Sequence, residues 1–451
     1  MKRHFFAAAL TFSLLALPHT FAQAADDRVR VGLAYGSTAL SAAQLQNTEG
    51  YDLGTIGANG FSAAKHVSNT KLTIVPSGSG LAVKDTQTGA VLYETNAPTL
   101  AISPSGDLAW FQKYQYRGDF MCQAANGKVT VVNDVALEDY IKGVVPYEMS
   151  PSWHKEALKA QAVCARSYVD GQKGRHKNNG FDVCSTTHCQ VYHGIGRATA
   201  NSNAAVEETR GQYLYEKNKK VVGYFFSSDG GATESAVNVW GGNYAYLTGK
   251  KDPYEKTESI SNGVWNKTLT AAEIRNKLVA SGRSIGEIQS VQVTKRTEMG
   301  NVNALTITDT SGKAVTLTKE ACRTVLGLNS IRYTVGGQGS LEGTQTSMVS
   351  VNDQLVKDGV FHTIQGDGTK TNIGSVHGKT ALTAVGKETL TTAAQQTFGS
   401  DPAVTGKSYT FSGRGWGHHV GMSQYGAKAM AEQGMNYQQI LQFYYTGVTV
   451  K

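Results

Sequence analysis

The sequence predicts an α+β protein in which mixed β-rich domains carry a few packed helices. Apolar residues alternate with polar or small ones over 29–35, as in a half-buried strand. Apolar residues at positions 158, 162, 165 and 169 instead fall on one face of a helix. The 50 glycines, 8 prolines and 17% charged residues are typical of a turn-rich globular chain. Together these patterns exclude collagen, a coiled coil and a disordered chain.

The length of 451 residues allows two or three domains. Short alternating strands separated by Gly, Asn and Ser predict an N-terminal β-rich domain over 25–125. Changes of pattern then divide the rest into a core over 126–250, an α/β subdomain over 251–337, a β-rich insertion over 338–405 and a C-terminal part of the core over 406–451.

Cap residues predict where the helices begin. Ser150 is a candidate N-cap with Pro151 at the first helical position, and this helix is expected to end near Gly171. A capping box of Thr270 and Glu273 predicts a helix to 282. Two more helices are expected over 423–433 and from 436 onward.

The N-terminus predicts a secreted protein. Lys2 and Arg3 precede an apolar run over 5–17, and Ala22-Gln23-Ala24 follows as a small-residue cleavage site. We therefore expect a signal peptide over 1–24 and a mature chain without a membrane span, because no later segment reaches about 18 apolar residues. The net charge of +8 suits a polyanionic surface without identifying one.

A cluster of cysteines and histidines lies between 176 and 193. Cys184 and Cys189 stand close together, with His176, His188 and His193 nearby. Thiolates and imidazoles are the ligands that Zn²⁺ prefers, so this spacing predicts a zinc site. A disulfide that closes the short loop is the alternative in an oxidising compartment.

Glu148 is the candidate catalytic carboxylate. It lies in the run Val144-Val-Pro-Tyr-Glu-Met-Ser-Pro151, whose apolar residues would desolvate the carboxyl and raise its pKa toward that of a general acid. A helix that begins near Ser150 would oppose this effect, and the residue could also be a helix-entry residue without a chemical role. Glu138 and Asp139 are expected on a loop or strand end, so a mechanism with one carboxylate fits better than hydrolysis with two.

Two glycine-rich loops have the composition of a carbohydrate site. The first, 227–234, brings hydroxyl groups, carboxylates and flexible backbone directly after a buried strand. The second, 413–421, holds Trp416, His418 and His419 and lacks the spacing of a phosphate-binding loop. In each loop, glycines would let the backbone approach a bulky ligand closely.

Several blocks resemble the SpoIID/LytB family of sporulation and amidase-enhancer proteins. These blocks are Gly143-Val-Val-Pro-Tyr-Glu-Met-Ser-Pro151, the run Glu156 to Tyr168, Asp182 to Tyr192, Tyr224 to Glu234 and Gly415 to Ala427. Two departures are Ser150 between Met149 and Pro151, and His419 where the family usually has glycine; we expect His419 to reshape the sugar groove.

The resemblance implies a lytic transglycosylase that cleaves peptide-free peptidoglycan strands between MurNAc and GlcNAc and leaves 1,6-anhydroMurNAc ends. Glu148 occupies the catalytic position, in a long groove for a glycan strand. The implied substrate-binding residues are Tyr224, Ser227, Ser228, Gly230, Gly231, Thr233, Trp416, His418, His419 and Gln424. The implied zinc ligands are His176, Cys184 and Cys189, with His188 as an alternative imidazole.

The resemblance also leaves a second function open. A non-enzymatic wall-binding protein that stimulates a cell-wall amidase would need the same groove. In either case the expected partners are glycan strands, with an amidase as a further partner and no nucleic acid, and the expected location is extracytoplasmic and associated with the cell wall.

Overall fold

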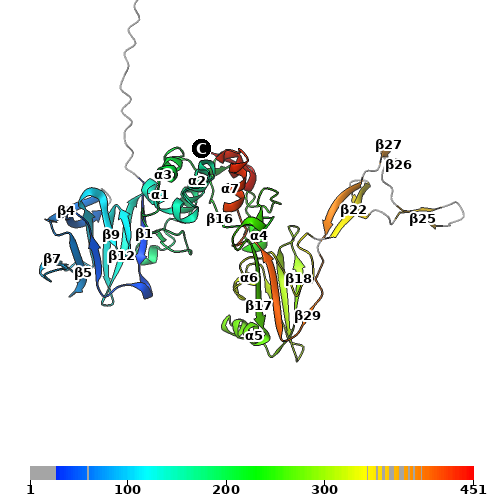
Figure 1. Ribbon diagram of the computed structural model, residues 1–451, viewed down its shortest axis with the longest axis horizontal. Coiled ribbons are helices and arrows are strands. Elements are labelled where there is room, and N and C mark those ends of the chain that lie inside the picture. Colours follow the sequence, from blue (N-terminus) through cyan, green and yellow to red (C-terminus); the bar gives the residue numbers. More distant parts are fainter. Residues whose placement is uncertain are drawn as a thin grey trace, which may run out of the picture.

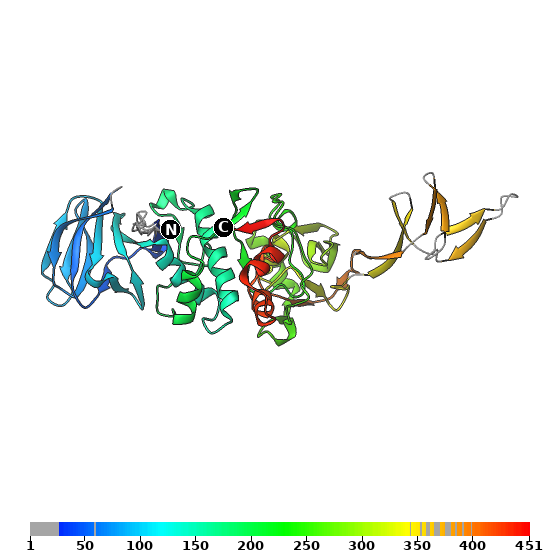
Figure 2. The ribbon, with the colours of Figure 1, turned by 90° about the horizontal axis from the view of Figure 1, so that it is seen from above.

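The computed structural model describes residues 27–57, 60–342 and 399–451 in full, together with the backbone of strands between 344 and 397. It confirms the predicted α+β class. A β-sandwich, a helical core, a second lobe and an arm of short strands follow one another along an elongated molecule (Figure 1 and Figure 2). Within the described residues, the helices lack the length and apolar content needed to cross a bilayer. The expected signal peptide lies outside this range.

The N-terminal domain consists of two sheets. The first has the order β13-β1-β12-β11-β8-β3-β4 and the second the order β10-β9-β2-β5-β6-β7. The strands of the first sheet are β1 (Arg28–Ala34), β3 (Tyr51–Gly57), β4 (Gly60–Val67), β8 (Thr99–Pro104), β11 (Asp119–Ala125), β12 (Lys128–Ala136) and β13 (Val183–Cys184). Those of the second are β2 (Ala43–Gln46), β5 (Lys71–Ser77), β6 (Gly80–Asp85), β7 (Val91–Thr95), β9 (Leu108–Phe111) and β10 (Tyr114–Arg117).

The helical core is built around α2, which contacts the other long helices of the core. These helices are α1 (Leu137–Glu148), α2 (Lys155–Gln172), α3 (Ala200–Glu207), α7 (Gln424–Glu432) and α8 (Tyr437–Tyr444). Short strands complete it: β14 (Leu214–Glu216), β15 (Lys219–Lys220) and β32 (Val448–Val450) form one sheet, and β16 (Phe225–Phe226) pairs with β31 (Met422–Ser423). Ser423 and Asn436 cap α7 and α8 as predicted.

Two predictions about the core helices are wrong. Glu138 and Asp139 lie in the first turn of α1 rather than on a loop or strand end. The following helix begins at Lys155 rather than next to Ser150, because the His154 ring accepts the Glu156 N–H and acts as the N-cap. The amide of Asn201 binds the carbonyls of Pro151 and Trp153, which holds 150–153 as a turn.

The second lobe contains two sheets, β17-β30-β21 and β20-β19-β18-β29. Its elements are α4 (Ala236–Val239), β17 (Val264–Thr270), α5 (Ala271–Ala280), β18 (Ile288–Arg296), β19 (Val302–Asp309), β20 (Ala314–Thr318), α6 (Ala321–Thr324), β21 (Tyr333–Val335), β29 (Val404–Thr405) and β30 (Ser408–Arg414). The predicted capping box of Thr270 and Glu273 begins α5. Because β30 pairs with β17 and β21, residues 408–414 complete this lobe, and the chain returns to the core only after them.

The arm consists of short antiparallel strands in the region of the predicted β-rich insertion (Figure 1). They are β22 (Thr344–Val351), β23 (Gln354–Lys357), β24 (Phe361–Ile364), β25 (Lys370–Gly374), β26 (Thr380–Thr383), β27 (Gly386–Thr389) and β28 (Thr392–Thr397).

The sandwich and the helical core share one hydrophobic interior. A single cluster of buried side chains extends from Val29 on β1 to Val448 on β32 and includes Ala236 and Val239 of α4, whereas the buried side chains of the two sheets of the second lobe and of α5 form a separate cluster. The first sheet is also connected to the core at two places: β12 continues directly into α1, and β13 pairs with β1 at the sheet edge. The sandwich therefore positions the core helices rather than being tethered beside them.

A buried ion pair joins α1 to α2. The Arg166 side chain is fully buried, and its Nε and Nη2 donate to Glu138 at 2.9 and 2.7 Å. Its Nη1 donates to the carbonyl of Gln212 at 3.1 Å, so the guanidinium is engaged on three sides. A bidentate pair of this kind is geometrically specific, and it fixes the rotation of α1 against α2.

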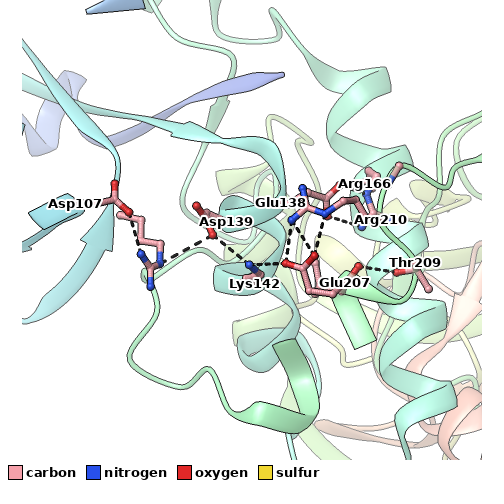
Figure 3. Close-up of polar contacts among 11 residues, drawn as sticks. Asp107, Glu138, Asp139, Lys142, Arg166, Glu207, Thr209 and Arg210 are labelled. Atoms are coloured by element: carbon pink, nitrogen blue, oxygen red, sulfur yellow. Dashed lines mark hydrogen bonds and ion pairs between the residues drawn. The ribbon is translucent and has the colours of Figure 1, made fainter. Parts of the chain in front are cut away.

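A chain of exposed and half-exposed ion pairs extends from the sandwich along α1 to α3 (Figure 3). Arg117 on β10 contacts Asp107 and Asp139 at 2.9 and 4.0 Å. Lys142 then bridges Asp139 and Glu207, at 3.4 and 2.7 Å. Each of these contacts is weak, but together they show that one side of α1 faces both the sandwich and α3.

We expect Arg166→Gln to destabilise the protein by about 3–5 kcal/mol, because it leaves the Glu138 carboxylate buried without a partner. Denaturant unfolding followed by circular dichroism measures the effect. Lys155→Gln is the matched control: it breaks an exposed pair with Glu208 and is expected to cost less than about 1 kcal/mol. The double variant Arg166→Met/Glu138→Leu should recover most of the loss; if Arg166→Gln alone matches the control, the ion pair does not hold the helices.

Candidate active site and metal centre

Glu148 is the last residue of α1. The helix ends here because Met149 adopts an extended conformation and the following Ser150-Pro151 pair disfavours helical backbone. The Met149 N–H still closes the last turn on the carbonyl of Val145, at 2.9 Å. Glu148 is therefore held at the negative end of a helix, which disfavours its ionised form.

Two donors hold the Glu148 carboxyl in place. The backbone N–H of Val191 donates to Oε1 at 3.1 Å, and the side-chain amide of Gln424 donates to Oε2 at 3.3 Å. Gln424 is the first residue of α7 and lies 3.4 Å from the Gln161 side chain on α2. The core helices α1, α2 and α7 thus meet at this carboxyl, and the implied role of Gln424 near the reacting group fits its position.

Burial raises the pKa of Glu148 above its ordinary value. The hydrogen bonds from Val191 and Gln424 act in the opposite direction, because both favour the carboxylate. Burial is the larger effect. Glu148 therefore keeps its proton more readily than an exposed glutamate. Both donors nevertheless remain in place to bind the carboxylate once the proton has left. A residue that alternates between general acid and general base requires both properties.

The two glycine-rich loops lie against each other. The N–H of Trp416 donates to the carbonyl of Ser228 at 2.7 Å, and the Ser228 N–H returns a bond to Trp416 at 3.1 Å. At Gly421 φ is +84°, and a Cβ would come within 2.0 Å of the Tyr224 carbonyl oxygen, so only glycine allows this approach. Gly421 therefore lets the second loop pack closely against the segment that precedes the first loop.

Glu255, which the sequence analysis did not identify, anchors the first loop. Its carboxylate accepts the Ser228 hydroxyl at 2.6 Å and the N–H groups of Asp229 and Gly230 at 3.0 Å each. The Ser423 hydroxyl, at the N-cap of α7, donates to the same carboxylate at 2.7 Å. The loop and the start of α7 are therefore positioned together by one buried side chain.

The N–H groups of Gly230 and Gly231, two of the implied substrate-binding residues, are engaged within the protein. The Gly230 N–H is taken by Glu255, and the Gly231 N–H donates to the carboxylate of Asp229 at 2.8 Å. Burial raises the pKa of Asp229 well above its ordinary value, and the neighbouring Glu255 adds to this rise. These groups hold the loop rather than offer donors to a ligand.

Thr233 and His419 do not face a groove either. The Thr233 hydroxyl is buried and accepts the Lys250 N–H at 2.9 Å. The His419 ring is fully buried and stacks on Phe226 with a centroid distance of 5.3 Å, and the expected reshaping of the sugar groove by this residue stays a prediction. Burial lowers the pKa of His419 well below its ordinary value, and the ring therefore stays neutral.

Trp416, Ser227 and Ser228 do line a cavity, of about 220 Å³. Tyr425, which follows Gln424 on α7, lines it as well. The Trp416 side chain is 46% exposed, so an aromatic face is available beside hydroxyl groups, the combination expected for a sugar. The sequence analysis did not select Tyr425, although its position directly after Gln424 in the motif Gly415 to Ala427 could have indicated that it lies near the site.

Tyr224 and His418 belong to a second aromatic group. Trp240, which is exposed, lies with its ring 4.8 Å from that of Tyr224 and 5.0 Å from that of His418. Burial lowers the pKa of His418 to about 4, so this imidazole is neutral near pH 7. Both predicted residues are half-buried and part of an aromatic surface rather than isolated hydrogen-bonding groups.

The predicted metal ligands lie together. His176, Cys184, His188 and Cys189 place one donor atom each within 4.8 Å of one another. Nε2 of His176 is 3.5 Å from Sγ of Cys189, and Nδ1 of His188 is 3.6 Å from both sulfurs. The turn before Cys189 lets His188 face inward beside it, so the structure brings both imidazoles to the thiols. The thiols of Cys184 and Cys189 are not joined as a disulfide.

The two thiols are close enough to influence the protonation of each other. The hydrogen bond with Cys189 lowers the pKa of Cys184 to about 3, whereas its bond with Cys184 raises the pKa of Cys189 well above the ordinary value. One proton is in effect shared between two sulfurs, and a cation would replace it. Two thiols and two imidazoles match the donor set of a closed zinc site.

The sandwich supports this group of donors. Cys184 lies on β13, which pairs in parallel with β1 at the sheet edge. The His176 ring stacks on Phe181, with centroids 4.9 Å apart. Phe181 in turn covers Gly32 of β1, where a Cβ would meet the ring at 2.4 Å. Two residues after Cys189, Val191 donates its N–H to Glu148, so the donor group and the catalytic candidate share one segment.

Comparisons with known proteins identify the family of this chain. Residues 125–215, which hold α1, α2, Glu148 and the four donor residues, match the family described as stage II sporulation protein, SpoIID. The chain is 32% identical over 326 residues to the amidase enhancer of Bacillus subtilis (strain 168), which covers 69% of this chain and 40% of the relative. A protein of Brachyspira hyodysenteriae is 30% identical over 74% of this chain and 72% of the relative.

A third relative is the stage II sporulation protein D of Bacillus subtilis, 26% identical over 71% of this chain and 75% of its own length. The fold and the site together define an α+β protein with a buried candidate carboxyl, Glu148, held by Gln424 next to the cavity of Trp416 and Tyr425. The chain belongs to the SpoIID/LytB family. It spans 40% of the length of the amidase enhancer that it matches.

We expect Glu148→Gln to be at least as stable as the wild type at pH 7. Because the folded-state pKa of Glu148 is raised, its stabilising contribution is complete below the unfolded pKa, about 4.3, and is lost as pH rises through the folded pKa. Glutamine removes the buried charge, so the Glu148→Gln variant should lose its stability advantage over the wild type below about pH 4, where Glu148 is protonated in both the folded and the unfolded state. Thermal unfolding at both pH values measures it, and a variant that is less stable at pH 7 would contradict a raised pKa.

Proposed function

We propose that the protein is a peptidoglycan lytic transglycosylase that cleaves peptide-free glycan strands between MurNAc and GlcNAc, with Glu148 as its single general acid and base. The observation that carries this proposal is the isolation of the Glu148 carboxyl. Its hydrogen-bond partners are the N–H of Val191 and the amide of Gln424, and among the described residues no hydrogen bond or ion pair joins it to a second carboxyl group. Hydrolysis of a glycosidic bond usually needs two carboxyl groups, whereas a lyase-type cleavage needs one.

The chemistry balances with one carboxyl. Protonated Glu148 gives its proton to the glycosidic oxygen as the bond from the anomeric carbon of MurNAc to that oxygen breaks. The resulting carboxylate then takes the proton of the MurNAc C6 hydroxyl, whose oxygen forms the new bond to the same anomeric carbon. The products are a 1,6-anhydroMurNAc end and a free GlcNAc hydroxyl. Glu148 regains its proton, and water is not consumed.

The geometry suits both halves of this cycle. Burial and the end of α1 keep the carboxyl protonated for the first step. The N–H of Val191 and the amide of Gln424 stabilise the carboxylate in the interval before the second step. Trp416 and Tyr425 provide aromatic faces next to Gln424 on which sugar rings would lie.

The relatives support a role at the cell wall. One is named for sporulation and another for enhancing an amidase. The latter name favours a second candidate function for this chain: binding of the wall and stimulation of an amidase without catalysis. The two functions use the same groove and differ only in whether Glu148 performs chemistry.

We also propose that His176, Cys184, His188 and Cys189 bind one zinc ion. Four protein donors would leave no open position, so the ion would be structural rather than catalytic. Zinc bound there would hold the segment 184–191 in shape, and this segment supplies the Val191 N–H to Glu148. The proposed metal site would thus act on catalysis by positioning.

We expect Glu148→Gln to reduce cleavage of peptide-free glycan strands by about 10²–10⁴-fold, since the variant cannot transfer the proton. Mass spectrometry of the products would detect the anhydro ends. Glu287→Gln is the control, because this exposed glutamate lies in the second lobe and should leave the rate unchanged. If wild type and Glu148→Gln bind strands but give equally little product, the enzyme proposal fails and the enhancer function remains.

Metal analysis of the purified mature chain tests the zinc proposal. We expect about one zinc ion per chain in the wild type and little in Cys184→Ser or His188→Ala, with a lower melting temperature in both variants. Cys322→Ala is the control, since this buried thiol lies in the second lobe. Equally low zinc in the wild type and Cys184→Ser would reject the site.

A further inference from the structure

A second cavity, of about 290 Å³, continues from the Trp416 cavity and contains positive charge. The two cavities share Ile260 and Tyr425. The second is lined by Tyr254, Lys256, Ile260, Tyr425, Lys428 and Glu432, among others. Aromatic and cationic side chains therefore surround one hollow beside the proposed glycan groove.

The cavity begins one helical turn from the catalytic candidate. Gln424, whose amide holds Glu148, and Lys428 are four residues apart on α7, so they share a face and lie about 6 Å apart along the axis. Trp153, on the turn that follows α1, packs against Tyr425 with centroids 4.9 Å apart. The Lys428 ammonium lies 5.5 Å from the centre of the Trp153 ring.

The charges of this cavity favour an anionic ligand. Two lysines, Lys256 and Lys428, and one glutamate, Glu432, line the cavity, so one positive charge is left over. Lys428 contacts Glu432 at 3.4 Å, but the Glu432 side chain is 53% exposed, and such pairs are weak. Among the described residues, no ion pair holds the Lys256 ammonium. An incoming carboxylate could therefore replace Glu432 and meet both lysines.

We propose that this cavity is a subsite for a muramyl residue, in which Lys256 and Lys428 bind the carboxylate of its lactyl group. This inference rests on the proposed glycan substrate. Rings of Tyr254 and Tyr425 supply faces for the sugar, and the lactyl carboxylate is the charge that a peptide-free strand carries. When a stem peptide is attached, that carboxylate becomes an amide without charge. The lysines would thus select peptide-free strands.

Binding assays on the mature chain in the Glu148→Gln background, at one low ionic strength, test the subsite without turnover. The probes are peptide-free glycan strands and the same strands with their carboxyl groups converted to methyl esters. We expect the acidic strands to bind about tenfold more tightly than the esters, the size of one charge-assisted hydrogen bond. The double variant Lys256→Gln/Lys428→Gln should lose this preference, and Glu432→Gln should increase it.

The control is Lys128→Gln/Lys313→Gln, which removes two exposed lysines from the sandwich and the second lobe and should keep the preference. Equal binding of acid and ester by the parent, or an unchanged preference in the Lys256/Lys428 variant, would overturn the subsite. A further result would also overturn it: polyglycerol phosphate competes for binding in a way that depends on these lysines, while the acidic strands and their esters bind equally well. Failure of the cleavage assay with the preference intact would reject the proposed enzyme and keep the subsite.

Discussion

The buried ion pair between Arg166 and Glu138 is the contact on which the geometry of the site depends. It sets α1 against α2, and α1 carries Glu148 at its far end, almost three helical turns from Glu138. A small rotation of α1 would take the carboxyl away from both of its donors. Because an unpaired buried charge costs several kcal/mol, the alternatives to this arrangement are strongly disfavoured. The stability of the core and the proposed role of Glu148 thus depend on the same helix pair.

The sandwich has a second, related influence on the site. Its first sheet supplies β12, which leads into α1, and β13, which carries Cys184. Both candidate centres are consequently anchored to one sheet, and the shared hydrophobic cluster leaves little freedom between them. Val191 connects the two centres, because it follows the candidate metal ligands in the sequence and its N–H donates to the carboxyl of Glu148. A disturbance at Cys184 should therefore be felt at Glu148.

Local patterns predicted most of the fold and the central residues of the site. Capping residues located α5, α7 and α8, and the blocks of family motif located Glu148, Gln424 and the Cys/His group. Helix α1 was missed because Gly143, two valines and Pro146 lower its intrinsic propensity, which burial overrides. The use of loop N–H groups by Glu255 was also missed, since its partners lie 25 or more residues away in the sequence and leave no local signal.

The helix α7 connects these observations. Its N-cap Ser423 is tied to Glu255 and hence to the glycine-rich loops, and its first residue, Gln424, holds Glu148. One turn further on the same face, Lys428 lines the charged cavity. The start of this helix cannot shift without moving the loop, the carboxyl and the cavity together. In the proposed function, this one rigid element would set both the reaction and the recognition of the neighbouring sugar, which is how a site with a single catalytic carboxyl could still align its substrate.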